Sequence, residues 1–267
     1  MIGLLIFPCL ACLILVGIHT HLGLHVIKRG VIFVDLCLAQ MAALGTVVAL
    51  LLGYTEQAPW ITYAISLGFT FTGAWILSQL RSLPKGCSQE AVIGILYALS
   101  TALSLLLLSK MPSESHQIES MLTGNILLVD LKETLFIATL YSVVGLIHWK
   151  FHSQFEEKAG TKAWDFFIYL TLGAVVTSSV KVGGVMLMFA YLIIPAMTSF
   201  LIAKKRQSQL FLGWSVGWMA SIIGIAGSVY FDLPTGSAII SVLGLSFFSV
   251  LVFRKKLSSI NSSVFFG

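Results

Sequence analysis

The fold of this chain is decided by residues 28–45, which read Lys-Arg-Gly-Val-Ile-Phe-Val-Asp-Leu-Cys-Leu-Ala-Gln-Met-Ala-Ala-Leu-Gly. Two basic residues are followed by a long apolar run that contains one acid, Asp35. The pattern is typical of a helix that starts at a membrane surface and enters the bilayer. Because a carboxylate inside a bilayer costs about 3 kcal/mol or more, we expect Asp35 to face a bundle interior or a water-filled path.

The composition of the whole chain also indicates a membrane protein. Of its 267 residues, 57% are hydrophobic and 10% are charged, and the mean hydropathy is +0.95. Soluble domains carry roughly 25% charged residues, so this chain is solvated mainly by lipid. Apolar runs of about twenty residues predict a single all-α polytopic membrane domain, residues 1–267, with about nine transmembrane helices. The predicted spans are 2–27, 30–53, 59–80, 89–109, 132–149, 164–180, 182–203, 209–230 and 235–253.

The basic residues orient the predicted bundle. Most of the 16 Lys and Arg residues fall in alternate loops, which the positive-inside rule assigns to the cytoplasm. This alternation predicts an N-terminus outside and a C-terminus in the cytoplasm. The net charge of +5 is dispersed over these loops, so it indicates orientation in a lipid bilayer and no nucleic-acid partner.

Three histidines lie near the end of the first predicted span. His21 and His25 are four residues apart, so a helix places them on one face, where they could hold one divalent metal ion. Interfacial histidines can also lie beside lipid headgroups or bond to the backbone. His19 falls on a different face. The turn after this span brings its end back alongside Asp35, and imidazole with carboxylate is ligand chemistry for zinc and manganese.

Asp35 and Gln40 each have a structural and a functional interpretation. Asp35 lies about 9 Å along a helix from Arg29, so it could pair with that guanidinium or could bind a passing cation. Gln40 lies about 140° from Asp35 around an ideal helix, and a π-bulge between them would bring both side chains onto one face. Without a bulge, the Gln40 amide can hydrogen-bond between helices. Pro195, inside the seventh predicted span, predicts a helix kink.

A cytoplasmic loop predicts a docking element. Residues 151–160 are charged, long enough for about two helical turns, and stopped by Gly160. A short amphipathic helix there would suit a partner protein. The chain lacks the phosphate-binding pattern Gly-x4-Gly-Lys-Ser/Thr, so ATP-driven transport would need a separate ATPase chain. The sequence also offers no complete base-and-nucleophile set, so we expect no enzyme activity.

Several stretches resemble the permease subunits of ABC-type zinc, manganese and iron importers. Residues 182–196 read Val-Gly-Gly-Val-Met-Leu-Met-Phe-Ala-Tyr-Leu-Ile-Ile-Pro-Ala, similar to the Gly-x-Leu-Leu-x-x-x-Leu-Leu-Ile-x-Pro-Ala run of that family. Lys28-Arg29 followed by Asp35 is similar to its Arg-Arg-x5-Asp pattern. Residues 89–98, 122–127 and 232–236 resemble further family stretches, in the same order. The helix that docks the family's ATPase is similar to Phe155, Glu156, Glu157, Lys158, Ala159 and Gly160.

The resemblance implies a multi-pass importer of the bacterial cytoplasmic membrane. Its expected partners are a second copy of the chain, an ATP-binding subunit at the cytoplasmic face and an extracellular metal-binding protein. No permanently bound cofactor is expected. The cargo would be a divalent metal, zinc or manganese, with iron or an iron chelate as the alternative. An ion-coupled secondary carrier, with Asp35 as its cation or proton site, is the alternative function.

The resemblance also implies a metal pathway at Asp35, with one departure. In the family this acid is followed four residues later by a histidine, whereas Ala39 stands at that position here and Gln40 follows. His21 and His25 are therefore candidates to supply the missing imidazole.

Overall fold

The computed structural model describes residues 2–54, 59–82, 88–111, 126–157 and 161–264, which are helical apart from short turns. The helices are α1 (Ile2–Arg29), α2 (Val34–Leu51), α3 (Pro59–Ser78), α4 (Gln89–Leu108), α6 (Leu131–Lys150), α7 (His152–Glu157), α8 (Lys162–Ile202), α9 (Arg206–Phe231) and α10 (Thr235–Val264), with 3-10 turns η1 (Gln79–Ser82) and η3 (Ile126–Leu128). No strand occurs in these ranges, which confirms the all-α class.

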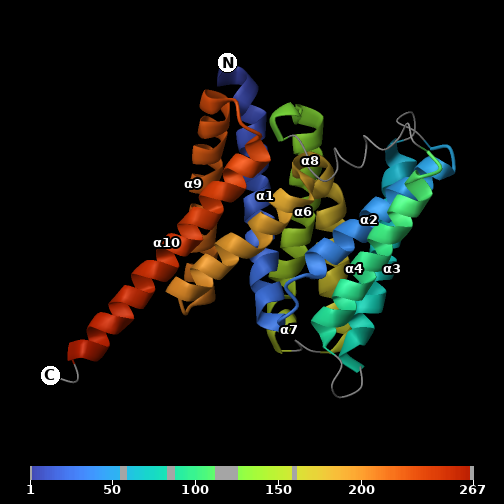
Figure 1. Cartoon of the computed structure of the whole chain (residues 1–267). Coiled ribbons are helices and arrows are strands. Elements are labelled where there is room, and N and C mark those ends of the chain that lie inside the picture. Colours follow the sequence, from blue (N-terminus) through green and yellow to red (C-terminus); the bar gives the residue numbers. More distant parts are fainter. Residues whose placement is uncertain (1, 55–58, 83–87, 112–125, 158–160, 265–267) are drawn as a thin grey trace.

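Helix α8 supplies two of the predicted spans. Eight helices in the described part of the chain are long and apolar enough to cross a membrane, and α8 has 41 residues. A straight helix of that length would measure about 60 Å, twice the thickness of the hydrocarbon core. Its backbone leaves the helical conformation at Gly184, where φ is 76° and ψ is 161°, a region that glycine enters without steric cost. The two arms of α8 run in different directions from this point, so the described helices account for nine spans (Figure 1).

The end of α1 is defined by a glycine. Gly30 has a φ of 69°, and its N–H donates to the Ile27 carbonyl at 3.1 Å while the Val31 N–H donates to the Val26 carbonyl at 3.5 Å. This pair of hydrogen bonds is the usual closure of a helix at a glycine. Because the turn occupies the next residues, α2 begins at Val34 and not at the predicted position 30.

Helices α1, α2 and α8 form the interior of the bundle. Helix α1 packs against α6, α8 and α9, and α2 packs against α3, α4 and α8. Close packing of α2 depends on Gly45, because a Cβ there would lie 2.6 Å from the Ser66 Cα in α3. In contrast, α10 is largely exposed and runs out along one side of the bundle (Figure 1).

The two ends of the chain lie at opposite ends of the bundle. The start of α1 is at the upper end in Figure 1, whereas the end of α1, helix α7 and the end of α10 are at the lower end. This arrangement agrees with an odd number of spans. That the lower end faces the cytoplasm stays a prediction from the basic loops.

Candidate metal centre

Three imidazoles from two helices form one cluster. His21 and His25 lie on the same face of α1, as their spacing predicts, with ring centroids 5.1 Å apart. His148, in the last turn of α6, has its ring centroid 5.3 Å from that of His21 and 5.7 Å from that of His25. One ring nitrogen from each residue lies within 4.8 Å of the other two. We call these three residues the His cluster; nitrogen donors so close together can ligate one divalent transition-metal ion.

His148 is oriented by a second polar residue. Its Nε2 lies 2.9 Å from the Thr171 hydroxyl in α8, and that hydroxyl donates to the Phe167 or Ile168 carbonyl at 3.1 or 3.0 Å. The Thr171 oxygen therefore accepts from Nε2–H, which leaves a lone pair on His148 Nδ1. His21 Nε2–H donates to this Nδ1 at 3.3 Å, so a metal ion shared by the two imidazoles would take the place of that proton. An outer hydrogen bond of this kind fixes an imidazole as a metal ligand needs it.

His25 is bonded to an arginine. Its side chain is buried, and the Arg206 Nη2 of α9 lies 2.6 Å from its Nε2. A guanidinium only donates hydrogen bonds, so His25 Nε2 accepts with its lone pair. The lone pair that a metal ion would use is therefore occupied by Arg206 in this structure.

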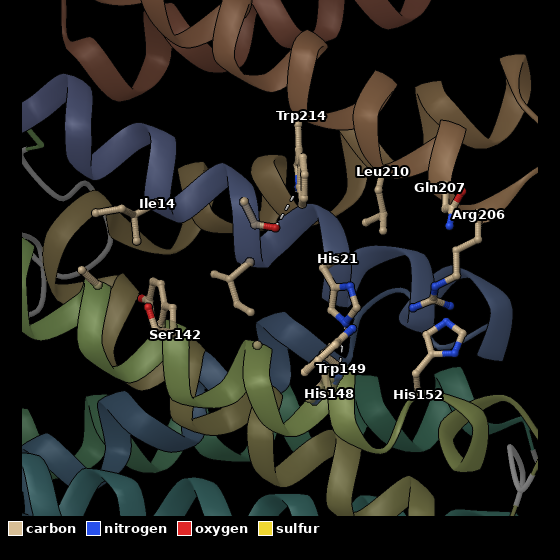
Figure 2. A pocket seen from close by; sticks show the side chains of 15 residues that line it. Ile14, His21, Ser142, His148, Trp149, His152, Arg206, Gln207, Leu210 and Trp214 are labelled. Atoms are coloured by element: carbon tan, nitrogen blue, oxygen red, sulfur yellow. Dashed lines mark hydrogen bonds between the residues drawn. The ribbon is translucent and has the colours of Figure 1, made fainter.

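An open cavity of about 770 Å³ reaches the cluster between α1, α6 and α9. Figure 2 shows the histidine, arginine and glutamine side chains of its lining gathered at one end: His21, His148, His152, Arg206 and Gln207. Ile14 lies towards the other end, and Trp214 joins α9 to α1 by donating from Nε1 to the Gly17 carbonyl at 3.0 Å. Two of the three cluster imidazoles thus line a space large enough for a hydrated ion.

Helix α7 lies directly against the cluster. Phe155 is 1% exposed, and its ring stacks on that of His148 with centroids 4.4 Å apart. Its centroid is 5.8 Å from that of His25. The short helix predicted for 151–160 is present as His152–Glu157 and includes the backbone of Glu156 and Glu157. The remaining predicted coupling residues, Lys158, Ala159 and Gly160, lie outside the described residues.

Asp35 occupies a separate place in the bundle. It lies in the first turn of α2 and is 1% exposed, and its Oδ1 has no hydrogen-bond partner in the described part of the chain. Arg29, which the sequence offered as its partner, instead donates from Nε to Asp165 Oδ1 at 3.0 Å. Asp35 does not join His21 and His25 in one group of donors; His148 takes the place expected for a carboxylate.

Three other expectations have mixed outcomes. Helix α2 is an uninterrupted α-helix, so the bulge that would bring Gln40 beside Asp35 is not formed, and Gln40 is buried on another face. His19 points away from the cluster as predicted and bonds to the backbone of α1. Pro195 lies in helical residues of the second arm of α8, whose break is at Gly184. A kink at Pro195 stays a prediction.

Two residues of the site were not singled out from the sequence. His148 is the second-last residue of the fifth predicted span and Arg206 precedes the eighth, and neither belongs to a recognisable motif. The predicted topology nevertheless contained a signal. Spans one and five both run inward, so His148 had to lie on the same membrane side as His21 and His25.

Comparison with known proteins establishes the class. Residues 2–254 match the ABC 3 transport family, and the chain belongs to this family. It is therefore a multi-pass membrane protein of a bacterial ABC transport system, which confirms the resemblance seen in the sequence.

Individual relatives agree with the family assignment. The manganese transport system membrane protein MntC of Listeria monocytogenes is 30% identical over 214 residues, covering 73% of this chain and 76% of that protein. The chelated iron transport system membrane protein YfeD of Yersinia pestis is 27% identical over 208 residues, covering 73% and 70%. The structure of PsaBC from Streptococcus pneumoniae in complex with Fab has a TM-score of 0.76 at 21% identity, covering 92% of this chain and 90% of that one, and shows the same fold.

Proposed function

We propose that this chain is the permease subunit of an ATP-driven importer of a divalent transition metal, zinc or manganese. The observation that carries the proposal is the His cluster, whose three ring nitrogens lie within 4.8 Å of one another beside an open cavity. Imidazole nitrogens are common ligands for divalent first-row metals such as zinc. The names of the relatives, for manganese and for chelated iron, support a metal cargo.

Asp35 supports the same proposal from another part of the bundle. A buried carboxylate with an unpartnered oxygen is costly unless a positive charge offsets it. A passing divalent ion supplies that charge. We therefore place Asp35 and the imidazoles of His21 and His25 on the metal pathway. The geometry of α2 adds no support for Gln40 as a metal-pathway residue.

The partners follow from the family and from α7. An ABC permease works with an ATP-binding subunit. We propose α7 as its docking element, because this short helix lies at the end of the bundle where the basic loops predict the cytoplasm. A second copy of the chain and an extracellular metal-binding protein complete the proposed importer. In this proposal the chain itself hydrolyses no ATP and carries metal only as cargo.

The test is metal uptake by the assembled complex. The permease, its ATPase and its binding protein are reconstituted in liposomes, and uptake of Zn²⁺, Mn²⁺ and Fe²⁺ is measured with ATP and with a non-hydrolysable ATP analogue. Uptake of Zn²⁺ or Mn²⁺ that requires ATP hydrolysis is expected. Uptake driven by an ion gradient without the ATPase would instead establish a secondary carrier, and absence of uptake for all three metals would overturn the metal proposal.

A further inference from the structure

The side chain of Arg206 stands between the cavity and His25. Arg206 lines the cavity together with His21 and His148, whereas His25 is 2% exposed and is not part of the lining. The Arg206 guanidinium lies 2.6 Å from His25 Nε2. A metal ion that arrives from the cavity therefore meets a positive charge before it reaches the His25 lone pair.

The guanidinium and a metal ion cannot share this nitrogen. Nε2 has one lone pair, and it is directed at an N–H of Arg206 in this structure. A guanidinium stays protonated at any physiological pH. It also repels a divalent cation held only a few ångströms away, and this repulsion is stronger at a partly buried site than in bulk water. Metal binding to all three imidazoles thus requires the Arg206 side chain to move.

Arg206 is placed where it can move. It is the first residue of α9, preceded by Lys205 in an extended conformation and by the short segment after Ile202. Its long side chain comes from a helix end and reaches towards His152 and the polar end of the cavity (Figure 2). In contrast, the imidazoles are held on the helix faces of α1 and α6. One side chain can leave the cluster while the ligands stay in place.

We infer that Arg206 is a tethered cation that competes with the transported metal for His25, so that the His cluster is a site of brief metal occupancy and release. This inference deepens the proposed function, because it takes the metal at the cluster to be the cargo. A site near the exit of an importer has to let the ion go. Return of Arg206 to His25 displaces the ion without any further change in the helices.

The competition is tested by equilibrium binding of Zn²⁺ to the permease–ATPase complex in nanodiscs, without ATP or binding protein. Removing the charge in Arg206→Gln should tighten Zn²⁺ binding about tenfold or more. Other changes of residues that contact metal ligands alter metal affinity by a similar factor. Arg206→Lys keeps the charge and should stay close to wild type. The matched control is Lys204→Gln, which removes one charge from an exposed position in the same loop. The double variant Arg206→Gln with His148→Ala should lose the gain.

The contradicting results are distinct. Equal or weaker Zn²⁺ binding by Arg206→Gln would show that Arg206 only holds His25 in position, and a gain that survives His148→Ala would place the ion elsewhere. Either result overturns the competition. Metal uptake by the wild-type complex in liposomes tests the proposed function separately. If the wild type shows ATP-driven uptake but Arg206→Gln does not bind Zn²⁺ more tightly, only this inference is overturned. If Arg206→Gln binds Zn²⁺ more tightly but the wild-type complex takes up no metal, the competition is supported and the proposed import function is overturned.

Discussion

Asp35 and the His cluster are two candidate metal positions of opposite character. Asp35 is a single carboxyl group on α2, buried and without a partner for one of its oxygens. The His cluster offers neutral nitrogen donors, opens to a cavity and has a guanidinium against one of its nitrogens. A buried carboxylate attracts a divalent ion strongly, whereas neutral donors beside a positive charge hold it weakly. If both positions belong to the proposed metal pathway, they should therefore hold the ion with different strength.

Removal of the charge at Asp35 should have the largest effect. We expect Asp35→Ala to lower metal uptake by the intact complex by about 100-fold or more, as expected when one partner of a buried charge pair is lost. Asp35→Asn keeps the shape of the side chain and should lower metal uptake equally, because the negative charge attracts the metal ion. Uptake rates over a range of Zn²⁺ and Mn²⁺ concentrations measure this. Full uptake by Asp35→Ala, in a complex that still assembles with its ATPase, would remove Asp35 from the pathway.

Loss of imidazoles from the cluster should have the next largest effect. Replacing both His21 and His25 by Ala should weaken metal binding by about 10- to 100-fold, at least the cost of losing an outer-shell partner. His19→Gln is the matched control, since His19 is a buried histidine of the same helix outside the cluster. The measurements are uptake rate and preference among zinc, manganese and iron. Unchanged rate and preference in the double variant would leave Asp35 as the only supported position.

A change at Phe155 tests whether the cluster communicates with the ATPase. The Phe155 ring stacks on His148 and belongs to the proposed docking helix. Phe155→Leu should reduce the stimulation of ATP hydrolysis by metal about fivefold, the low end of typical coupling between sites. Basal hydrolysis should stay near wild type.

Phe151→Leu serves as the control for Phe155, because Phe151 is a half-buried aromatic residue next to α7 that packs on Trp164 and not on a cluster imidazole. If metal stimulates hydrolysis equally in the Phe155 variant and in wild type, the contact with His148 carries no signal.

The smallest effect is expected where only the packing of α2 against α3 is disturbed, away from Asp35. In Gly45→Ala the new methyl group meets the backbone of α3 at Ser66, and overpacking of this kind costs about 1–3 kcal/mol. Gly68→Ala in α3 is the matched control, since no atom lies within 4 Å of its added Cβ. Thermal unfolding in detergent should show a lower midpoint temperature for Gly45→Ala than for wild type. The midpoint of Gly68→Ala should be unchanged. Equal midpoints would mean that α2 shifts freely against α3.

Much of the fold could be predicted from residue type and order. Apolar runs as long as the bilayer is thick must become helices, because no other structure of a single segment satisfies its backbone in lipid. The predicted spans consequently match the helices closely, and the exceptions are local. Gly30 delays the start of α2 to Val34, and Gly184 sets the break in α8 three residues after the expected position. Both depend on a positive φ at one glycine, which the apolar pattern does not reveal.

The candidate site could be predicted only in part. The sequence by itself determined the membrane fold, the family and the shared face of His21 and His25, because these follow from local composition and helical periodicity. Only the tertiary structure decided that His148 completes the cluster, that Arg206 donates a hydrogen bond to His25 Nε2 and that Arg29 pairs with Asp165. These contacts join residues more than a hundred positions apart. They depend on how the helices pack, and no spacing along one helix encodes that packing.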